Sequence, residues 1–283
     1  MSIIEKALDR VRQRTVTPLE DAPASLQRPS KAPAAGTFAP RSIAVDLTRL
    51  RAQDQLPEAG LERRFADYYR DIKRPLIQAM LTDKARADSR LVIITSAIPG
   101  EGKTFTALNL ALSVARERDV SVLLVDADVP KGHLSSTFGL QDTPGLLDAL
   151  MDETVDVDSL VFGTDIKGLE MLPAGKAAEA ATEFLASARM GQIALRLARH
   201  PRRLVLFDSP PLLASSESRA LKQIPGQFLI VTRAGRTPRQ ALLDAIALID
   251  ETKLHGLVLN DSNAVKGGSY YTHYGYSGYG AAQ

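Results

Sequence analysis

Residues that could hold a polyphosphate lie close together between positions 97 and 106. Gly100 and Gly102 are followed directly by Lys103 and Thr104. Glycines let backbone N–H groups approach phosphate oxygens closely, and a helix that begins here directs its positive dipole end at the anion. Lys103 would then reach the outer phosphates, and the Thr104 hydroxyl would bind Mg²⁺. The residue types and their spacing therefore predict a site for a nucleotide with Mg²⁺.

The segments on either side of these residues have the periodicity that such a site needs. The apolar run 91–94 predicts a strand that is buried on both faces, and apolar residues at helical spacing continue from 103 to 115. A strand, a glycine-rich loop and a helix in this order form a P-loop. The pattern G-x-x-x-x-G-K-[ST] is met from 97 to 104, except that Ala97 replaces the first glycine.

Carboxylates follow two further apolar runs. The run 120–125 ends at Asp126 and Asp128, and the run 204–207 ends at Asp208. Ligands of open α/β sheets bind at the carboxyl ends of the strands, and carboxylates there can hold Mg²⁺ directly or through water. Each aspartate could instead cap a loop or a turn. We predict that all three lie near the P-loop.

The remaining chain alternates between apolar runs and helical patterns. Further strands are predicted around 169–172, 228–232 and 257–259, and helices around 133–138, 183–199 and 238–250, with a helical turn led by Gly145. Strands that are almost continuously apolar are typical of a parallel sheet with helices on both faces. The predicted fold class is therefore α/β with a P-loop.

The N-terminal part has a different composition. Residues 1–14 predict an amphipathic helix, which is too short to be stable alone and needs a surface on its own domain or on another protein. The segment 15–60 is rich in Pro and Ala and predicts a flexible linker, in which the apolar patch 43–47 can pair or dock. A helix is predicted over 61–81, and Pro75 is expected to kink or divide it.

A tyrosine-rich tail, 265–283, follows the predicted folded domain, 61–264. Five of the seven tyrosines of the chain lie here, at Tyr270, Tyr271, Tyr274, Tyr276 and Tyr279. The segment 270–279 lacks large aliphatic residues, so the tail is expected to be mobile. It could be a sticky low-complexity tail, but accessible phenols are also what a tyrosine-phosphorylation substrate requires.

Composition excludes several classes of function. A net charge of +2 over 283 residues shows no nucleic-acid footprint. The absence of cysteine excludes disulfides, cysteine nucleophiles and thiolate metal sites. No apolar run is long enough to span a bilayer, and the charges of Glu5 and Lys6 argue against a signal peptide, so a cytoplasmic location is expected.

Together these segments resemble the bacterial tyrosine kinases. The loop 96–104, the segment 123–128 and the segment 205–211 are similar to the Walker A, Walker A′ and Walker B motifs of that family, and the tyrosine tail is a further likeness. Residues 3–8 and 69–76 are similar to the subgroup linked to exosortase and exopolysaccharide loci. The resemblance implies a P-loop fold of the deviant Walker type, like that of MinD and ParA.

The resemblance also implies an activity, which is ATP-dependent autophosphorylation of the tail tyrosines in trans, with ATP and Mg²⁺ as cofactors. The residues concerned fall into three sets. ATP would contact Pro99, Gly100, Glu101, Gly102, Lys103, Thr104 and Phe105, Mg²⁺ would lie at Thr104, Asp126 and Asp208, and catalysis would use Lys103, Asp126, Asp128 and Asp208. Arg233 and Asn260 are expected near the adenine, although each could simply cap a strand end.

Partners follow from the same resemblance. We expect a homo-oligomer and a separate membrane adaptor of the polysaccharide copolymerase type, contacted by residues 1–14, which would bring the chain to the inner face of the cytoplasmic membrane. The oligomerisation helix of the family often carries E-x-x-R-x-x-R, whereas Asp67, Arg70 and Lys73 have that spacing here. Lysine and arginine are not equivalent in ion pairs. The ring assembly that members of the family form is therefore less secure for this chain.

Two other functions compete with the kinase. A ParA- or MinD-like switch ATPase usually carries a second lysine five residues before the P-loop lysine, and Ile98 occupies that position. Such proteins also use a C-terminal membrane helix, which is replaced here by the tyrosine tract. A nucleotide-binding regulator of polysaccharide export without catalysis stays open.

Overall fold

The computed structural model describes residues 41–262, apart from 83–86, 177, 179–180, 215–223, 225 and 251–252. The predicted N-terminal helix, 1–14, and the tyrosine tail, 265–283, lie outside the described residues.

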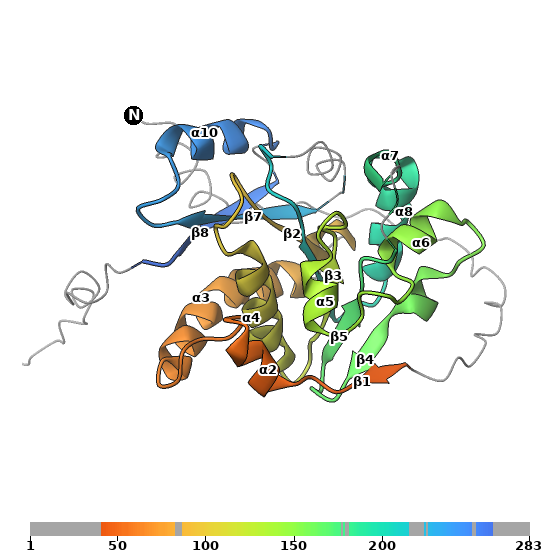
Figure 1. Ribbon diagram of the computed structural model, residues 1–283, viewed down its shortest axis with the longest axis horizontal. Coiled ribbons are helices and arrows are strands. Elements are labelled where there is room, and N and C mark those ends of the chain that lie inside the picture. The colour runs from red at the N-terminus through yellow and green to blue at the C-terminus, as the bar shows by residue number, and fades with distance from the viewer. Residues whose placement is uncertain are drawn as a thin grey trace, which may run out of the picture. The chain divides into compact units, whose positions relative to one another are not determined.

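An eight-stranded sheet runs through the domain in the order β1-β4-β5-β3-β6-β2-β7-β8 (Figure 1). The strands are β1 Ser42–Ile43, β2 Leu91–Ser96, β3 Ser121–Asp126, β4 Phe162–Thr164, β5 Leu169–Leu172, β6 Arg203–Asp208, β7 Gln227–Arg233 and β8 Leu254–Asn260. All neighbours are parallel except β4 and β5, which are antiparallel. The predicted α/β fold with a mostly parallel sheet is confirmed.

Helices cover both faces of this sheet (Figure 1). They are α2 Leu47–Ala52, α3 Glu62–Leu81, α4 Lys103–Ala115, α5 His133–Thr137, α6 Leu146–Met151, α7 Ala181–Leu185, α8 Ala188–Leu197 and α10 Arg239–Ala247, with 3-10 turns at Ala87–Arg90 and Val157–Leu160. Side chains alternate along each strand, so β2 sends Val92 and Ile94 into a core with α2, α3 and α4. Leu91 and Ile93 enter a second core with α6, α7, α8 and α10.

The linker prediction for 15–60 is wrong over its described part. Ser42 and Ile43 form β1, which pairs in parallel with β4, and the predicted pairing of the patch 43–47 is thereby confirmed. In α2, Leu50 is only 1% exposed, and Asp46 caps the helix by accepting the Arg49 N–H. Two or three well-placed apolar residues are enough to dock this segment, although its average composition is that of a linker.

Two helix predictions need correction. The helix predicted over 183–199 is divided into α7 and α8, because Ser187 has an extended backbone and its hydroxyl donates to the Phe184 carbonyl. Conversely, α3 runs through Pro75 without division, so the predicted division is wrong and the alternative, a kink at Pro75, stays a prediction. Proline removes the donor for the carbonyl four residues earlier, and here that residue is Asp71, an exposed position where water can replace the donor.

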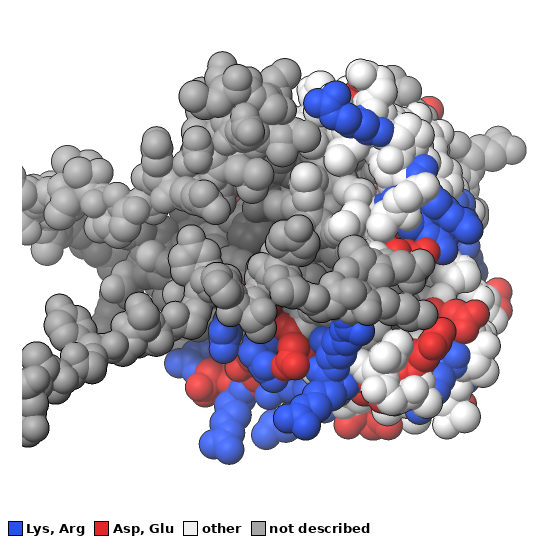
Figure 2. All heavy atoms as spheres, turned by 90° about the vertical axis from the view of Figure 1, so that its left-hand side faces the viewer, with Lys and Arg blue, Asp and Glu red and all other residues white. Residues whose placement is uncertain are grey.

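The α3 helix carries one buried lysine, Lys73, and several exposed arginines. Lys73 Nζ donates to the Ser113 carbonyl at 2.7 Å and pairs with Glu117 at 2.8 Å, which ties α3 to the end of α4. Figure 2 shows Lys and Arg side chains gathered on the lower part of the face to which α3 belongs. The helix contributes four exposed arginines, which are Arg63, Arg64, Arg70 and Arg74. Arg70 pairs with Asp67.

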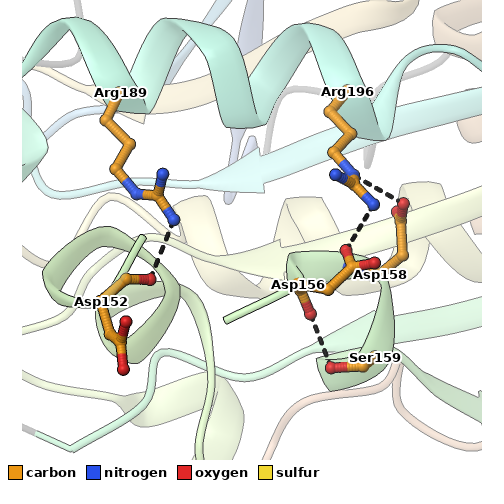
Figure 3. Close-up of polar contacts among 6 residues, drawn as sticks. All are labelled: Asp152, Asp156, Asp158, Ser159, Arg189 and Arg196. Atoms are coloured by element: carbon orange, nitrogen blue, oxygen red, sulfur yellow. Dashed lines mark hydrogen bonds and ion pairs between the residues drawn. The ribbon is translucent and has the colours of Figure 1, made fainter. Parts of the chain in front are cut away.

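Arginines of α8 fasten the segment between α6 and β4 (Figure 3). Arg196 pairs with Asp156 at 2.6 Å and with Asp158 at 2.8 Å, while Arg189 donates to the Asp152 carbonyl at 2.9 Å. These groups are about half exposed, so each ion pair contributes roughly 1 kcal/mol or less. They set the course of a surface segment rather than the stability of the domain.

None of the described helices is both long and apolar enough to cross a membrane.

Candidate nucleotide site

The loop between β2 and α4 has the backbone that phosphate binding requires. Gly100 has a φ of +81° and Gly102 a φ of +88°, in the left-handed region that glycine enters without steric cost. Gly102 is also the N-cap of the 13-residue helix α4. The first N–H groups of a helix have no partner within it, so they are free to meet an anion. The P-loop predicted from the sequence is therefore formed.

Sheet register brings the predicted aspartates to this loop. Asp208 at the end of β6 is paired with Asp126 at the end of β3 on one side and with Ile94 of β2 on the other. Lys103 Nζ lies 3.2 Å from Asp128 Oδ2, and both side chains are less than 10% exposed. One lysine and three carboxylates thus occupy a small, almost dry volume at the start of α4.

Asp208 is buried without a hydrogen-bond donor. It is 1% exposed, and neither carboxylate oxygen has a hydrogen-bond partner among the described residues. Burial raises the pKa of Asp208 to about 7, and the charge of Asp126 acts in the same direction, whereas Lys103 opposes both. The Thr104 side chain also lowers this pKa, although it makes no well-formed hydrogen bond to the carboxylate. A buried carboxyl of this kind is suited to receiving a cation.

Asp126 is held by one oxygen only. Its Oδ2 accepts the Ser135 N–H at 2.7 Å and the Ser135 hydroxyl at 2.6 Å, while its Oδ1 is buried and has no partner within the described part of the chain. Burial raises the pKa of Asp126, and the two bonds from Ser135 oppose that rise. Ser135 Oγ in turn accepts the Ala174 N–H at 2.9 Å, so the residue that holds this carboxylate is itself tied from α5 to the segment after β5.

These atoms fit a bound Mg²⁺. Three buried carboxylate oxygens, two of Asp208 and one of Asp126, receive no hydrogen bond from any described residue, and such oxygens are the ligands that Mg²⁺ prefers. No group of three or more His, Asp or Glu side chains in the described part of the chain is placed to hold a metal alone. A cation here would therefore be shared with phosphate oxygens, in the way that Mg²⁺ is usually bound beside nucleotides.

Arg233 and Asn260 both reach the P-loop. Arg233 donates to the Gly100 carbonyl at 3.2 Å and pairs with Asp261 at 2.9 Å. Asn260 Nδ2 donates to the Glu101 carbonyl at 3.0 Å. Arg233 ends β7 and Asn260 ends β8, and both side chains contact the P-loop backbone. Their role at the adenine stays a prediction.

Comparison with known proteins identifies the family of the chain. Residues 89–257 match the AAA domain family. EpsB of Ralstonia nicotianae is 34% identical over 198 residues, which are 68% of this chain and 26% of EpsB. YwqD, a tyrosine-protein kinase of Bacillus subtilis, is 32% identical over 189 residues, which are 66% of this chain and 77% of YwqD. The chain belongs to the bacterial tyrosine kinase family.

Solved structures of this tyrosine kinase family agree with the fold. The BceF tyrosine kinase domain is 26% identical and superimposes with a TM-score of 0.61, over 77% of this chain and 91% of that domain. The chain spans about a quarter of the length of EpsB, so the domain described here corresponds to one part of that protein.

Two of the predicted ATP-contacting residues, Glu101 and Phe105, use their side chains for contacts within the protein. Pro99 and Gly100 are exposed, whereas the Glu101 side chain is turned under the loop and is 2% exposed. The Phe105 ring packs edge-on against Phe65 of α3, with 6.0 Å between ring centroids, which leaves its backbone for any nucleotide contact. Sequence reasoning missed Ser135, because a serine on a short helix carries no signal of the carboxylate that it holds.

Removing the Ser135 hydroxyl is expected to weaken the Mg²⁺ dependence of nucleotide binding. In Ser135→Ala, Asp126 keeps one of its two bonds, and its free oxygen loses its fixed direction. The Mg²⁺ concentration that half-saturates ATP binding should rise about threefold to tenfold, which corresponds to the net contribution of about 1 kcal/mol that a typical hydrogen bond makes. Titration of a fluorescent ATP analogue measures it, with Ser159→Ala on the surface as control. An unchanged Mg²⁺ dependence would show that Ser135 does not orient Asp126.

Proposed function

We propose that the chain is an ATP-dependent protein-tyrosine autokinase that phosphorylates the tyrosines of its own C-terminal tail. The observation that carries this proposal is the cluster of Lys103 with three buried strand-end aspartates at the P-loop, two of which have unpartnered oxygens. Family membership and the predicted tail support the choice of tyrosine as acceptor. The tail tyrosines, Tyr270 to Tyr279, lie outside the described residues.

The residues divide the work of phosphoryl transfer between binding and proton transfer. Lys103 and the N–H groups of the loop would hold the outer phosphates of ATP, and Thr104, Asp126 and Asp208 would hold Mg²⁺. Bound Mg²⁺ would neutralise phosphate charge and so lower the barrier to attack. Because the transition state is loose, position and charge matter more than covalent chemistry.

Asp128 is the best-placed acceptor for the proton of the incoming tyrosine. Asp126 is engaged with Ser135, whereas the only ion pair of Asp128 within the described residues is with Lys103. When Lys103 turns to the phosphates, Asp128 becomes free to accept a hydrogen bond from a phenol, whose ordinary pKa is near 10. The phenol oxygen then bonds to the γ-phosphorus, the bond to ADP breaks, and the proton passes to Asp128 and on to water.

The resemblance to the exopolysaccharide-linked subgroup supports a role in exopolysaccharide synthesis or export, with a separate membrane adaptor that recruits the chain to the inner face of the cytoplasmic membrane. Residues 1–14 are the proposed contact, so deleting them should leave ATP binding intact and abolish capture of the adaptor.

Transfer in trans requires a homo-oligomer. Lys73 is committed to α4, so Arg70 and the other exposed arginines of α3 would have to carry such a contact.

The direct test is to incubate the purified chain with Mg²⁺ and ATP and to map phosphate by mass spectrometry. Phosphotyrosine is expected within 270–279 and should be absent from Lys103→Met. Lys131→Met, which removes an exposed lysine nearby, is the matched control and should retain it. ADP without phosphotyrosine, even with the adaptor present, would favour the switch ATPase, and ATP binding without turnover would favour the non-catalytic regulator.

A further inference from the structure

Glu101 is a loop residue whose side chain serves the loop itself. It lies between the two glycines of the P-loop but is 2% exposed. One carboxylate oxygen accepts the Ile98 N–H at 2.8 Å, which closes the start of the loop onto its middle. The other oxygen accepts the hydroxyl of Thr237, a residue 136 positions later in the chain.

Thr237 connects this carboxylate to the turn between β7 and α10. Its Oγ1 also accepts the Arg233 N–H at 2.8 Å, and its own N–H donates to the Arg233 carbonyl at 3.0 Å. The Arg233 guanidinium donates to the Gly100 carbonyl and is itself held by Asp261. One turn therefore contacts the loop twice, through the Glu101 side chain and through the Gly100 backbone.

The energetic importance of the Thr237 hydroxyl follows from burial. A carboxylate removed from water is costly unless donors meet it, and a hydrogen bond to a charged group is about twice as strong as one between neutral groups. Without the hydroxyl, Glu101 would keep only the Ile98 N–H and would gain by turning out into water. The bond that closes the loop would then be lost, together with the arrangement of N–H groups that a phosphate requires.

We propose that Thr237 and Glu101 are positioning residues for the P-loop: the β7–α10 turn holds the loop in its phosphate-accepting shape before a nucleotide binds. Neither side chain needs to touch the nucleotide. The proposal deepens the nucleotide-binding part of the function proposed above and rests on it, but it does not depend on tyrosine being the acceptor.

The test compares Thr237→Val, which keeps the shape and loses the hydroxyl, with Thr237→Ser, which keeps the hydroxyl. Thr164→Val is the matched control, because the Thr164 hydroxyl is bonded within the distant β4–β5 region. The ATP dissociation constant should rise about tenfold in Thr237→Val, as expected for one bond to a charged group, and should stay within about twofold of the wild-type value in the other two. Hydrogen exchange of peptide 97–104 without nucleotide should be faster in Thr237→Val alone.

Two results would overturn the proposal. One is Thr237→Val with wild-type ATP affinity and unchanged exchange over 97–104. The other is Thr237→Ser as impaired as Thr237→Val, because the hydroxyl would then not be the reason. If Thr237→Val does not fold, Glu101→Gln replaces it, since an amide has only one oxygen for the two donors and should show the same faster exchange. Failure of the kinase proposal looks different: the exchange and ATP-binding results stand, but no phosphotyrosine forms.

Discussion

Replacing Asp208 with asparagine is expected to stabilise the nucleotide-free protein while strongly reducing phosphoryl transfer. The wild-type carboxylate is buried, neither oxygen is hydrogen-bonded to a residue that the structure describes, and its pKa is raised from 3.8 to about 7. This rise in the pKa corresponds to roughly 4 kcal/mol of unfavourable free energy for the charged form of Asp208. Asparagine removes the buried charge, but its own amide is buried and polar, so only part of this unfavourable free energy is removed. A gain of about 1 to 3 kcal/mol in the free energy of unfolding is therefore expected.

The gain should depend on pH in a defined direction. A carboxyl with a higher pKa in the folded state holds its proton there after the unfolded chain has released it. Between about pH 4 and pH 7 the folded state therefore binds more protons, and the stability of the wild type falls as the pH rises. Asparagine does not titrate, so the advantage of Asp208→Asn should grow over this range and stay constant above it.

Urea unfolding of both proteins between pH 5 and pH 8, without nucleotide, measures this difference. Asp142→Asn, on the exposed loop after α5, is the control and should change stability by no more than about 0.5 kcal/mol. With Mg²⁺ and ATP, transfer by Asp208→Asn should fall by at least about a hundredfold, the usual cost of removing a group that stabilises charge in the transition state. A variant that is less stable than the wild type at pH 8 would contradict the unpartnered state of this carboxylate.

The parts of the site that sequence could predict are those with a local signal. Lys103 and Thr104 follow a glycine loop, and Asp126, Asp128 and Asp208 each follow an unbroken apolar run. Because parallel strands present their carboxyl ends at one edge of the sheet, these local signals were enough to place the residues together. The pairing of Asp126 with Asp208 depends on β6 lying beside β3, which no local pattern specifies.

The parts that could not be predicted depend on contacts between distant segments. In the sequence Glu101 is predicted only as one of the residues of the phosphate-binding loop. Its hydrogen-bond partner Thr237 lies far away in the sequence, in the turn between β7 and α10. Lys73 has the spacing of a surface motif, but its ammonium group is buried against α4. The short helix α2 was missed for a related reason, because a few docking residues are hidden in a Pro- and Ala-rich average composition, and β1 was predicted only as an apolar patch that can pair or dock.

Replacing Gly102 with alanine is expected to disrupt the site far more than the same change at Gly100. Both glycines have a positive φ, so alanine at either position costs about 1 to 2 kcal/mol of backbone strain. A Cβ at Gly102 would lie 2.0 Å from Asn260 Nδ2, whereas a Cβ at Gly100 would have no described atom within 4 Å apart from those of its own residue and its two chain neighbours. Gly102→Ala must therefore displace Asn260 and break its bond to the Glu101 carbonyl.

The contact with Asn260 should add about 1 to 3 kcal/mol to the loss of unfolding free energy in Gly102→Ala, the usual cost of overpacking. Unfolding of the nucleotide-free variants isolates this term from any contact with ATP. The double variant Gly102→Ala with Asn260→Ala removes the colliding amide and should recover stability to the level of Gly100→Ala, less the bond that Asn260 makes. If both single glycine variants lose the same stability, backbone strain alone explains the glycines and the close approach of β8 to the loop does not constrain the sequence.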